Sequence, residues 1–441
     1  MMLGKASLAC VIAVVSALAV TPAGADSTNV YVDRDSIGGA CSDLRPASEV
    51  TASSPWCTPA RAISAAPEGA TVLLRAGNYP AVKAVSVTRA QTLTLKAAPG
   101  EAVTLTGTST SNTDLTTRAV YVERSSNLRF EGLKITGGVY VSDSSSVQFL
   151  GNEITTIGMR LRNVSDALVA DNELHDFAGS MRALETTANV GEPGVKRLTI
   201  RGNELHAIEH DAMALYWRLE DVTVEDNYIH DVRRPVGSDL HTDALQIAPQ
   251  SEGAWGSIIV RRNRIMDYDQ GILIKDGATR GLVLENNVVG RPRVFAAHVY
   301  NAPNVRITNN TFAGGNLYLR DRTTAATVTN NVLEKFAIDA TASVAFADYN
   351  LVDRALHNPG YVPGPHDLNG RATFVDPAGG DYSLMATSLG VDSGSAANSA
   401  PTTDLLKRRR PVGDGYDMGA YERQAPGPAP ETDCEKACPG A

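Results

Sequence analysis

The feature that most constrains the fold is a short phrase that recurs along the middle of the chain. Each copy has alternating apolar residues, then a marker residue, then any residue followed by an apolar one. The markers are Gly132, Asn152, Asn172, Asn203, Asn227, Asn263, Asn287, Asn310 and Asn331. Six of the eight intervals between successive markers are 20 to 24 residues long. A β-rich phrase at this period, without helical periodicity, predicts an all-β solenoid of stacked coils.

A parallel β-helix satisfies the physical needs of such coils. One coil cannot bury its apolar side alone, so successive coils stack and share a continuous core. Equivalent residues then lie about 4.8 Å apart. Eight of the nine markers are asparagine, and stacked asparagines can pass hydrogen bonds from one amide to the next. Asparagine also favours turns for its own conformational reasons, but the strict register favours an internal ladder.

The flanking stretches divide the chain further. Residues 1–25 have a positive start at Lys5, an apolar run and a small-residue cleavage site, which predicts a secretory signal peptide. In an exported chain, Cys41 and Cys57 are expected to form a disulfide, and Cys434 and Cys438 could pair with each other. The remaining expected divisions are a cap at 26–80, coils at 81–385, a closing segment at 386–423 and a Pro-rich tail at 424–441.

Charge and hydropathy exclude some partners. The formal net charge is -9, from 40 basic and 49 acidic residues, and the basic run is confined to residues 407–410. Such a chain is not expected to bind nucleic acid. No apolar run after the signal is long enough to span a membrane. We expect a secreted monomer.

The stretch 391–422 contains the phrases VDSG, TDLLKRRRP and DMGAYE. It resembles the closing segment of many secreted bacterial β-helix proteins. Taken as a whole, the mature chain resembles the pectate-lyase-like right-handed parallel β-helix superfamily. This resemblance implies the fold and its handedness. The superfamily includes lyases, hydrolases, epimerases, tailspikes and adhesins, so the activity has to be inferred from a site.

Strand alternation predicts which polar side chains share an outer face. In the strand after each marker, apolar residues are expected to point inward and their neighbours outward. One predicted outer column is Arg162, Glu185, Tyr216, Ala248, Lys275, Tyr300 and Arg320. The adjacent predicted column is Arg160, Ala183, Ala214, Gln246, Leu273, His298 and Tyr318. Aromatic rings can stack against sugar faces and cationic side chains can bind carboxylates. These columns therefore predict the floor of a glycan-binding groove. An ordinary solvated face is the alternative.

Acidic residues gather where these strands begin. His210 and Asp211 precede one strand, the motif DLHTD (239–243) precedes the next, and Asp267 and Asp269 precede a third. Stacked carboxylates need a cation or a shared proton, and oxygen-rich clusters suit Ca²⁺. We therefore expect Glu185, Asp211 and Asp243 as possible calcium ligands, with turn capping as the alternative. By contrast, His175, His206 and His230 recur at one offset after the marker and predict a structural stack.

The columns and the acids together predict a polysaccharide lyase that cleaves an acidic, uronate-containing glycan by β-elimination. This reaction needs a base, neutralisation of the uronate carboxylate and a proton for the leaving oxygen. The expected base is Lys275, which could instead neutralise the carboxylate, and His241 is the alternative base. Tyr216 or Tyr300 is the expected acid. The expected substrate-binding residues are Arg160, Arg162, Gln246, His298, Tyr300, Tyr318 and Arg320.

Two phrases, GILIKDG with Lys275 and GNLYLRD with Arg320, resemble the chondroitinase B and alginate lyase branch of β-helix lyases. That resemblance implies a catalytic lysine and arginine on adjacent coils. In this sequence the two residues lie 45 positions apart, which predicts a separation of two coils. Three alternatives remain open: a glycoside hydrolase using Asp211 and Asp243, a C5-epimerase, and a non-catalytic glycan-binding or surface protein.

Overall fold

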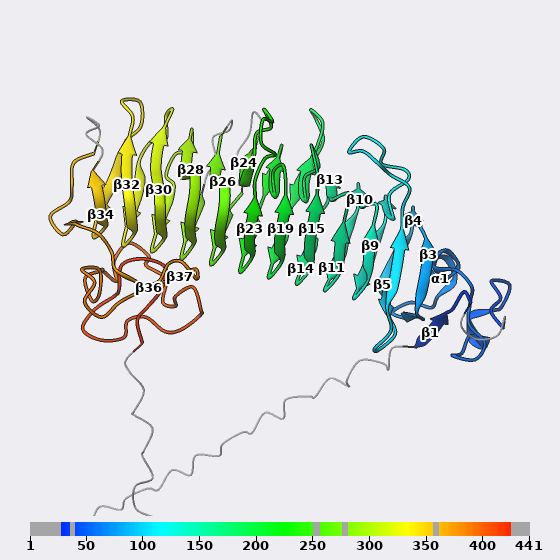
Figure 1. The fold of residues 1–441 in the computed structure, drawn as a ribbon. Helices are drawn as coiled ribbons and strands as arrows, with labels where there is room; N and C mark the ends of the chain where they lie inside the picture. The colour runs from blue at the N-terminus through cyan, green and yellow to red at the C-terminus, as the bar shows by residue number, and fades with distance from the viewer. Residues whose placement is uncertain (1–27, 36–39, 250–255, 276–280, 356–360, 425–441) are drawn as a thin grey trace, which may run out of the picture.

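The computed structural model describes residues 28–35, 40–249, 256–275, 281–355 and 361–424. The predicted signal peptide and the cysteine pair Cys434 and Cys438 lie outside these residues. In the described part of the chain, the coils form an elongated solenoid with two long parallel sheets of thirteen and twenty strands (Figure 1). No helix among the described residues is long and apolar enough to cross a membrane.

The thirteen-stranded sheet contains the strands that precede the markers. Its members are β1 (Asn29–Val32), β2 (Thr71–Leu74), β5 (Thr88–Ala97), β8 (Ser126–Glu131), β11 (Ser145–Leu150), β14 (Leu168–Ala170), β18 (Thr199–Arg201), β22 (Val222–Glu225), β25 (Ile258–Arg261), β27 (Leu282–Glu285), β29 (Arg306–Thr308), β31 (Ala326–Thr329) and β33 (Val344–Asp348). Alternate residues of these strands are buried, as in β22, so the period-two pattern of the sequence marks the core side correctly.

The twenty-stranded sheet contains the strands that follow the markers. Its members are β3 (Gly77–Pro80), β4 (Val82–Val85), β6 (Val103–Thr106), β7 (Val120–Glu123), β9 (Lys134–Thr136), β10 (Val139–Ser142), β12 (Glu153–Thr155), β13 (Met159–Arg162), β15 (Glu173–Phe177), β16 (Leu184–Thr187), β19 (Glu204–Ile208), β20 (Met213–Tyr216), β23 (Tyr228–Val232), β24 (Asp243–Ala248), β26 (Arg264–Ile274), β28 (Val288–Tyr300), β30 (Thr311–Arg320), β32 (Val332–Ile338), β34 (Leu351–Ala355) and β35 (Leu368–Asn369). A two-stranded sheet of β17 (Val195–Lys196) and β21 (Leu219–Glu220) supplements them.

The predicted asparagine ladder is confirmed. From Asn152 to Asn331, each buried Nδ2 donates to the Oδ1 of the next asparagine at 2.9 or 3.0 Å. Each Oδ1 also accepts the backbone N–H of the preceding asparagine. The ladder continues through Asn350, which the sequence phrase did not include, to the carboxylate of Asp367. Buried polar groups are thereby satisfied at the bend of each coil.

The N-terminal end contains the predicted disulfide, Cys41–Cys57, with a Cα–Cα distance of 5.0 Å. A short helix, α1 (Pro59–Ala65), follows a 3₁₀ turn η1 (Ala47–Glu49). The Thr58 side chain caps α1 by accepting the Arg61 N–H at 3.2 Å. Strands β1 and β2 pair with each other and β2 pairs with β5, so the range expected to form a cap already contributes to the solenoid.

The closing segment packs along the side of the last coils, below strands β28 to β34 in Figure 1. An antiparallel hairpin of β36 (Phe374–Asp376) and β37 (Asp381–Leu384) precedes it, within the range expected to form coils. The segment caps turn asparagines of the coils. Asn286 Nδ2 donates to the Thr403 carbonyl at 2.8 Å, and Asn330 Nδ2 donates to the Ser395 carbonyl at 2.7 Å.

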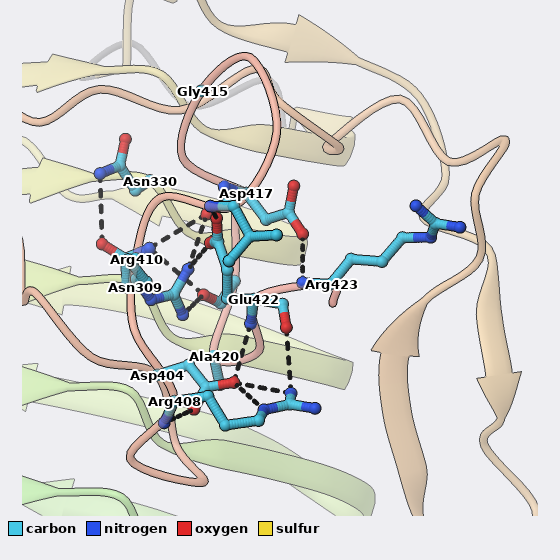
Figure 2. Close-up of polar contacts among 12 residues, drawn as sticks. Asn309, Asn330, Asp404, Arg408, Arg410, Gly415, Asp417, Ala420, Glu422 and Arg423 are labelled. Atoms are coloured by element: carbon cyan, nitrogen blue, oxygen red, sulfur yellow. Dashed lines mark hydrogen bonds and ion pairs between the residues drawn. The ribbon is translucent and has the colours of Figure 1, made fainter. Parts of the chain in front are cut away.

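The basic run 407–410 is part of this packing (Figure 2). Arg410 is buried and donates to Glu422 Oε2 at 2.9 Å and to the Gly419 carbonyl at 2.8 Å. Arg408 donates to Asp404 Oδ2 at 2.6 Å. Since both side chains are occupied within the protein, they hold the segment together, as the sequence resemblance implied.

Candidate functional site

The register of the coils brings most of the predicted outer columns together. Tyr216 lies beside Ala248, and Tyr300 lies beside Arg320. Ile274 pairs with Val299, so Lys275 follows at the level of Tyr300. Strand β28 separates the coils of Lys275 and Arg320, as the spacing of the two residues predicted. The column that contains Lys275, Tyr300 and Arg320 is therefore confirmed.

Glu185 occupies a different column from the predicted one. It pairs with Arg160 on one side and with Ala214 on the other, in the column that continues to Gln246 and His298. Ala183 does not belong to that column. The reason is Thr186, which is fully buried and occupies the inward position that a leucine occupies in neighbouring coils. Because a threonine is not recognisable from the sequence as a core residue, the predicted register of this strand was shifted relative to its neighbours.

A groove of about 870 Å³ lies over the coils that follow the DLHTD motif. Among the predicted site residues, Lys275, His241, His298 and Tyr300 line it. Its other lining residues are Gln270, Leu273, Phe295, Asn301, Asp321, Arg322 and Thr341. Predicted residues from the neighbouring strands β26 and β28 and from the loop before β24 thus share one concave surface.

A cluster of Asp211, His241 and Asp243 lies at one end of this groove, with both carboxyl groups buried and His241 exposed, and we refer to it as the Asp–His cluster. One ligand atom of each residue lies within 4.8 Å of the others. His241 Nδ1 is 3.0 Å from Asp243 Oδ2, and the Asp243 N–H donates to Asp211 Oδ1 at 3.0 Å. The Asp243 side chain is fully buried, and neither of its oxygens accepts a hydrogen bond of good geometry from the described residues.

The two carboxyl groups of the cluster differ in acidity. Burial raises the pKa of Asp243 to about 6, although His241 and Lys275 act in the opposite direction. Burial also opposes ionisation of Asp211, but hydrogen bonds with His210 and Arg182 outweigh it and lower the pKa of Asp211. The hydrogen bond with Asp243 raises the pKa of His241. The cluster therefore combines an ionised acid, a weak acid and a basic imidazole.

Glu185, which the sequence suggested as a third calcium ligand, lies outside the Asp–His cluster. Its carboxylate is 2.5 Å from Arg160 Nε and 3.5 Å from Arg182 Nη1. Among the described residues, His241 completes the cluster instead.

Aromatic residues form the middle of the groove. His298 stacks on Phe295, with 3.8 Å between ring centroids, and accepts a hydrogen bond from Asn316 Nδ2 at 3.2 Å. Burial, aided by Arg320, lowers the pKa of His298 to about 4. At neutral pH His298 is thus an uncharged ring against which a sugar face can pack.

Arg320 lies behind the groove between two tyrosines. Its guanidinium carbon is 5.0 Å from the ring centroid of Tyr300 and 4.8 Å from that of Tyr318. Its Nη1 donates to the Tyr300 hydroxyl at 3.0 Å. Arg320 therefore holds Tyr300 in place through a hydrogen bond and a cation–π contact.

The remaining predicted residues lie beyond the Asp–His cluster, outside the groove lining. The Tyr216 hydroxyl donates to the Gln246 side chain, and the Gln246 side chain is buried. Arg160 forms an ion pair with Glu185, and Arg162 forms one with Glu192. Two of the three arginines expected to bind substrate carboxylates are thus paired with protein carboxylates.

Sequence reasoning missed Phe295 and Arg182. Phe295 is on the long strand β28, where a register shift between Gly290 and Ala297 disturbs the alternation. Arg182 comes from the insertion at 178–196, whose path the period of the coils does not determine. The predicted histidine stack is confirmed, with 5.0 Å between neighbouring ring centroids of His175, His206 and His230.

Comparison with known proteins agrees with this geometry at the level of the fold. A family model described as a right-handed β-helix region matches residues 97–242. A search of curated proteins finds no significant match. The structure of pectate lyase Pel9A is 15% identical, with a TM-score of 0.51 over 91% of this chain and 98% of that one. The complex of XylC with xylose is 10% identical, with a TM-score of 0.52 over 89% and 98%.

A surface adhesin of Streptococcus pneumoniae, PfbA, is 11% identical, with a TM-score of 0.49 over 66% of this chain and 84% of that one. The matches to Pel9A and XylC support the fold alone, and the activity has to be argued from the site. The chain is therefore a right-handed parallel β-helix protein of the pectate-lyase-like fold.

Proposed function

We propose that the protein is an extracellular polysaccharide lyase that cleaves an acidic, uronate-containing glycan by β-elimination. The observation that carries this proposal is the placement of Lys275 and His241 in one groove, with the buried carboxyl groups of Asp211 and Asp243 beside His241. The aromatic floor of Phe295, His298 and Tyr300 supports a sugar ligand. The disulfide Cys41–Cys57 supports an oxidising compartment outside the cytoplasm.

In the proposed reaction, the Lys275 amine removes the proton on C5 of the uronate. The electron pair of that bond forms the C4–C5 double bond, and the C4–O bond to the next sugar breaks. The Tyr300 hydroxyl gives its proton to the leaving oxygen, and the adjacent Arg320 stabilises the resulting phenolate. The imidazolium of His241, favoured by Asp243, faces the substrate carboxylate and offsets its charge.

The Asp–His cluster also has the donors for a divalent cation. Asp243 Oδ1 is buried and accepts no hydrogen bond from the described residues, while Oδ2 lies 3.0 Å from His241 Nδ1, so a bound cation would stabilise this carboxylate. Asp211, Asp243 and a neutral His241 would hold it, and a cation there would withdraw charge from the substrate carboxylate. The calcium expected from the sequence is thus kept as a hypothesis with His241 in place of Glu185.

A glycoside hydrolase is the second candidate. The pKa values of Asp211 and Asp243 are shifted in opposite directions, which is the pattern of a catalytic base and a catalytic acid. Both carboxyl groups are buried, however, whereas Lys275 and His241 line the groove. Because a catalytic group has to reach its substrate, this difference in access favours the lyase.

The test is an absorbance assay at about 232 nm, where the unsaturated product of a uronate lyase absorbs. The purified protein is incubated with alginate, pectate and glycosaminoglycans, with and without EDTA. We expect a rise in absorbance with one of these glycans, and a loss of at least about 100-fold in rate for Lys275→Ala, because a general base contributes that much or more. Lys134→Ala is the matched control, since Lys134 is a half-exposed residue that pairs with Glu153 elsewhere on the solenoid.

Other outcomes would redirect the proposal. New reducing ends without absorbance would indicate a hydrolase, and binding without either signal would indicate a glycan-binding protein. Unchanged activity of Lys275→Ala would remove Lys275 from the reaction. A loss of activity with EDTA that added Ca²⁺ or another divalent cation restores would support a cation in the Asp–His cluster.

A further inference from the structure

The groove is asymmetric along the solenoid axis. Its lining comes from five successive coils, from His241, just before β24, to Thr341, just after β32. The reactive side chains His241 and Lys275 belong to the first two of these coils. At the other end, Asp321, Arg322 and Thr341 are exposed to solvent. Four coil spacings of about 4.8 Å give the groove a length of roughly 19 Å.

On the N-terminal side of His241, one outward-facing column of the same sheet is covered, while Arg160, Arg162 and Tyr216 are partly exposed. Glu185, Ala214 and Gln246 alternate with inward-pointing residues and so face away from the core. Even so, their exposed fractions are only 6%, 0% and 3%. Residues that face outward on an open sheet would be accessible, so other side chains lie over them.

Arg182, from the insertion at 178–196, is a central part of this cover. Its guanidinium carbon lies 5.5 Å from the ring centroid of Tyr216. Its Nε donates to Asp211 Oδ2 at 2.9 Å, and its Nη1 is 3.5 Å from Glu185 Oε2. Glu185 is held from the other side by Arg160. Charge-assisted contacts from several directions fix Arg182 in this position.

We propose that Arg182 and its partners close the N-terminal end of the groove, so that the protein acts on the end of a glycan chain. This inference rests on the proposed function, because it concerns how the substrate reaches the same site. A polymer cleaved in its interior needs open surface on both sides of Lys275. Here a chain that continued past Lys275 toward the N-terminal coils would collide with Arg182. A chain end enters from the exposed side and releases a short product of constant size.

The experiment uses the full chain and the glycan that gives the absorbance signal. Absorbance at about 232 nm, solution viscosity and product size by gel filtration are followed together. For the wild type we expect one short unsaturated product from the first time point and little loss of viscosity as absorbance rises. Long oligosaccharides with an early, steep loss of viscosity would overturn the closed groove while leaving the lyase proposal intact. An absence of absorbance with every glycan would remove both.

Arg182→Ala tests the residue itself. We expect its products to include longer oligosaccharides, with a larger loss of viscosity for each bond cleaved than in the wild type. Because Arg182 also contacts Asp211, the readout is the product distribution rather than the rate. The matched control is Arg197→Ala, since Arg197 pairs with Asp166 on an exposed part of the solenoid. An unchanged single product from a folded Arg182→Ala protein would contradict the assignment to Arg182, and the wild-type pattern decides the matter if the variant does not fold.

Discussion

At the scale of single residues, the groove illustrates how surroundings determine the charge of a side chain. His241 and His298 both line the groove, yet their pKa values shift in opposite directions. His241 hydrogen-bonds to the carboxylate of Asp243, which favours the imidazolium. His298 is buried against Phe295 and lies near Arg320, which favours the neutral ring. His241 is therefore suited to bind a carboxylate, and His298 is suited to pack against an uncharged sugar face.

The neutral His298 should make stability depend on pH. The pKa of His298 is lowered from 6.5 to about 4 in the folded state, so between these values the unfolded chain binds a proton that the folded chain does not. The free energy of unfolding should therefore fall as the pH decreases from about 6.5 towards about 4. In His298→Gln this contribution is absent, so the fall should be smaller. Urea unfolding at several pH values measures it, and an equal slope in both proteins would show that His298 is protonated in the folded state.

At the scale of the coil, the asparagine ladder links each bend to the next. Asn227 is a typical member. Its Oδ1 accepts hydrogen bonds from the backbone N–H and the Nδ2 of Asn203, and its own Nδ2 donates to the Ile200 carbonyl and to Asn263 Oδ1. All of these side chains are buried, so water cannot replace a lost partner. One asparagine thus satisfies groups from several coils.

Replacing a ladder member should consequently be costly. Asn227→Ala leaves buried donors and acceptors on neighbouring coils unpaired, and each such group costs about 1–3 kcal/mol. We expect the free energy of unfolding to fall by about 3 kcal/mol or more, measured by urea unfolding. The control is Asn369→Ala, since Asn369 is exposed, and its effect should lie within about 0.5 kcal/mol. A similarly small change in Asn227→Ala would mean that the ladder tolerates gaps.

At the scale of the whole molecule, the C-terminal segment packs along the side of the solenoid and links several coils. It spans several coils, with Lys407 Nζ 3.1 Å from Asp226 Oδ2 and Asn330 Nδ2 bonded to the Ser395 carbonyl. Its own interior depends on the buried pair of Arg410 and Glu422, with both side chains fully inaccessible. Removing one partner of such a pair leaves an uncompensated buried charge.

Glu422→Ala should therefore destabilise the packing of the C-terminal segment against the coils. We expect a loss of about 3–5 kcal/mol in the stability of this segment, seen as faster limited proteolysis within residues 371–424 and a lower Tm. The double variant Arg410→Met with Glu422→Leu should lose less, because no buried charge is left alone. Arg409→Ala is the control, since Arg409 is exposed. Equal proteolysis of wild type and Glu422→Ala would show that the pair does not hold the segment.

The sequence alone was enough to predict the solenoid, the asparagine ladder, the disulfide and part of the groove lining. Period-two alternation and the regular asparagine marker are local signals, and stacking repeats them from coil to coil, so register follows from counting residues. Lys275, His298 and Tyr300 could be assigned to one face on this basis. The predicted register was wrong at Glu185, because the inward position of its strand is occupied by a threonine rather than by an apolar residue.

Only the tertiary structure decided which parts of that face are open. The insertions have no period, so nothing in the sequence places Arg182 over Tyr216 or pairs Arg162 with Glu192. Whether an arginine binds a substrate carboxylate or a protein carboxylate depends on which is nearer in space, and local sequence does not contain that distance. The same reason explains why His241, rather than Glu185, joins Asp211 and Asp243.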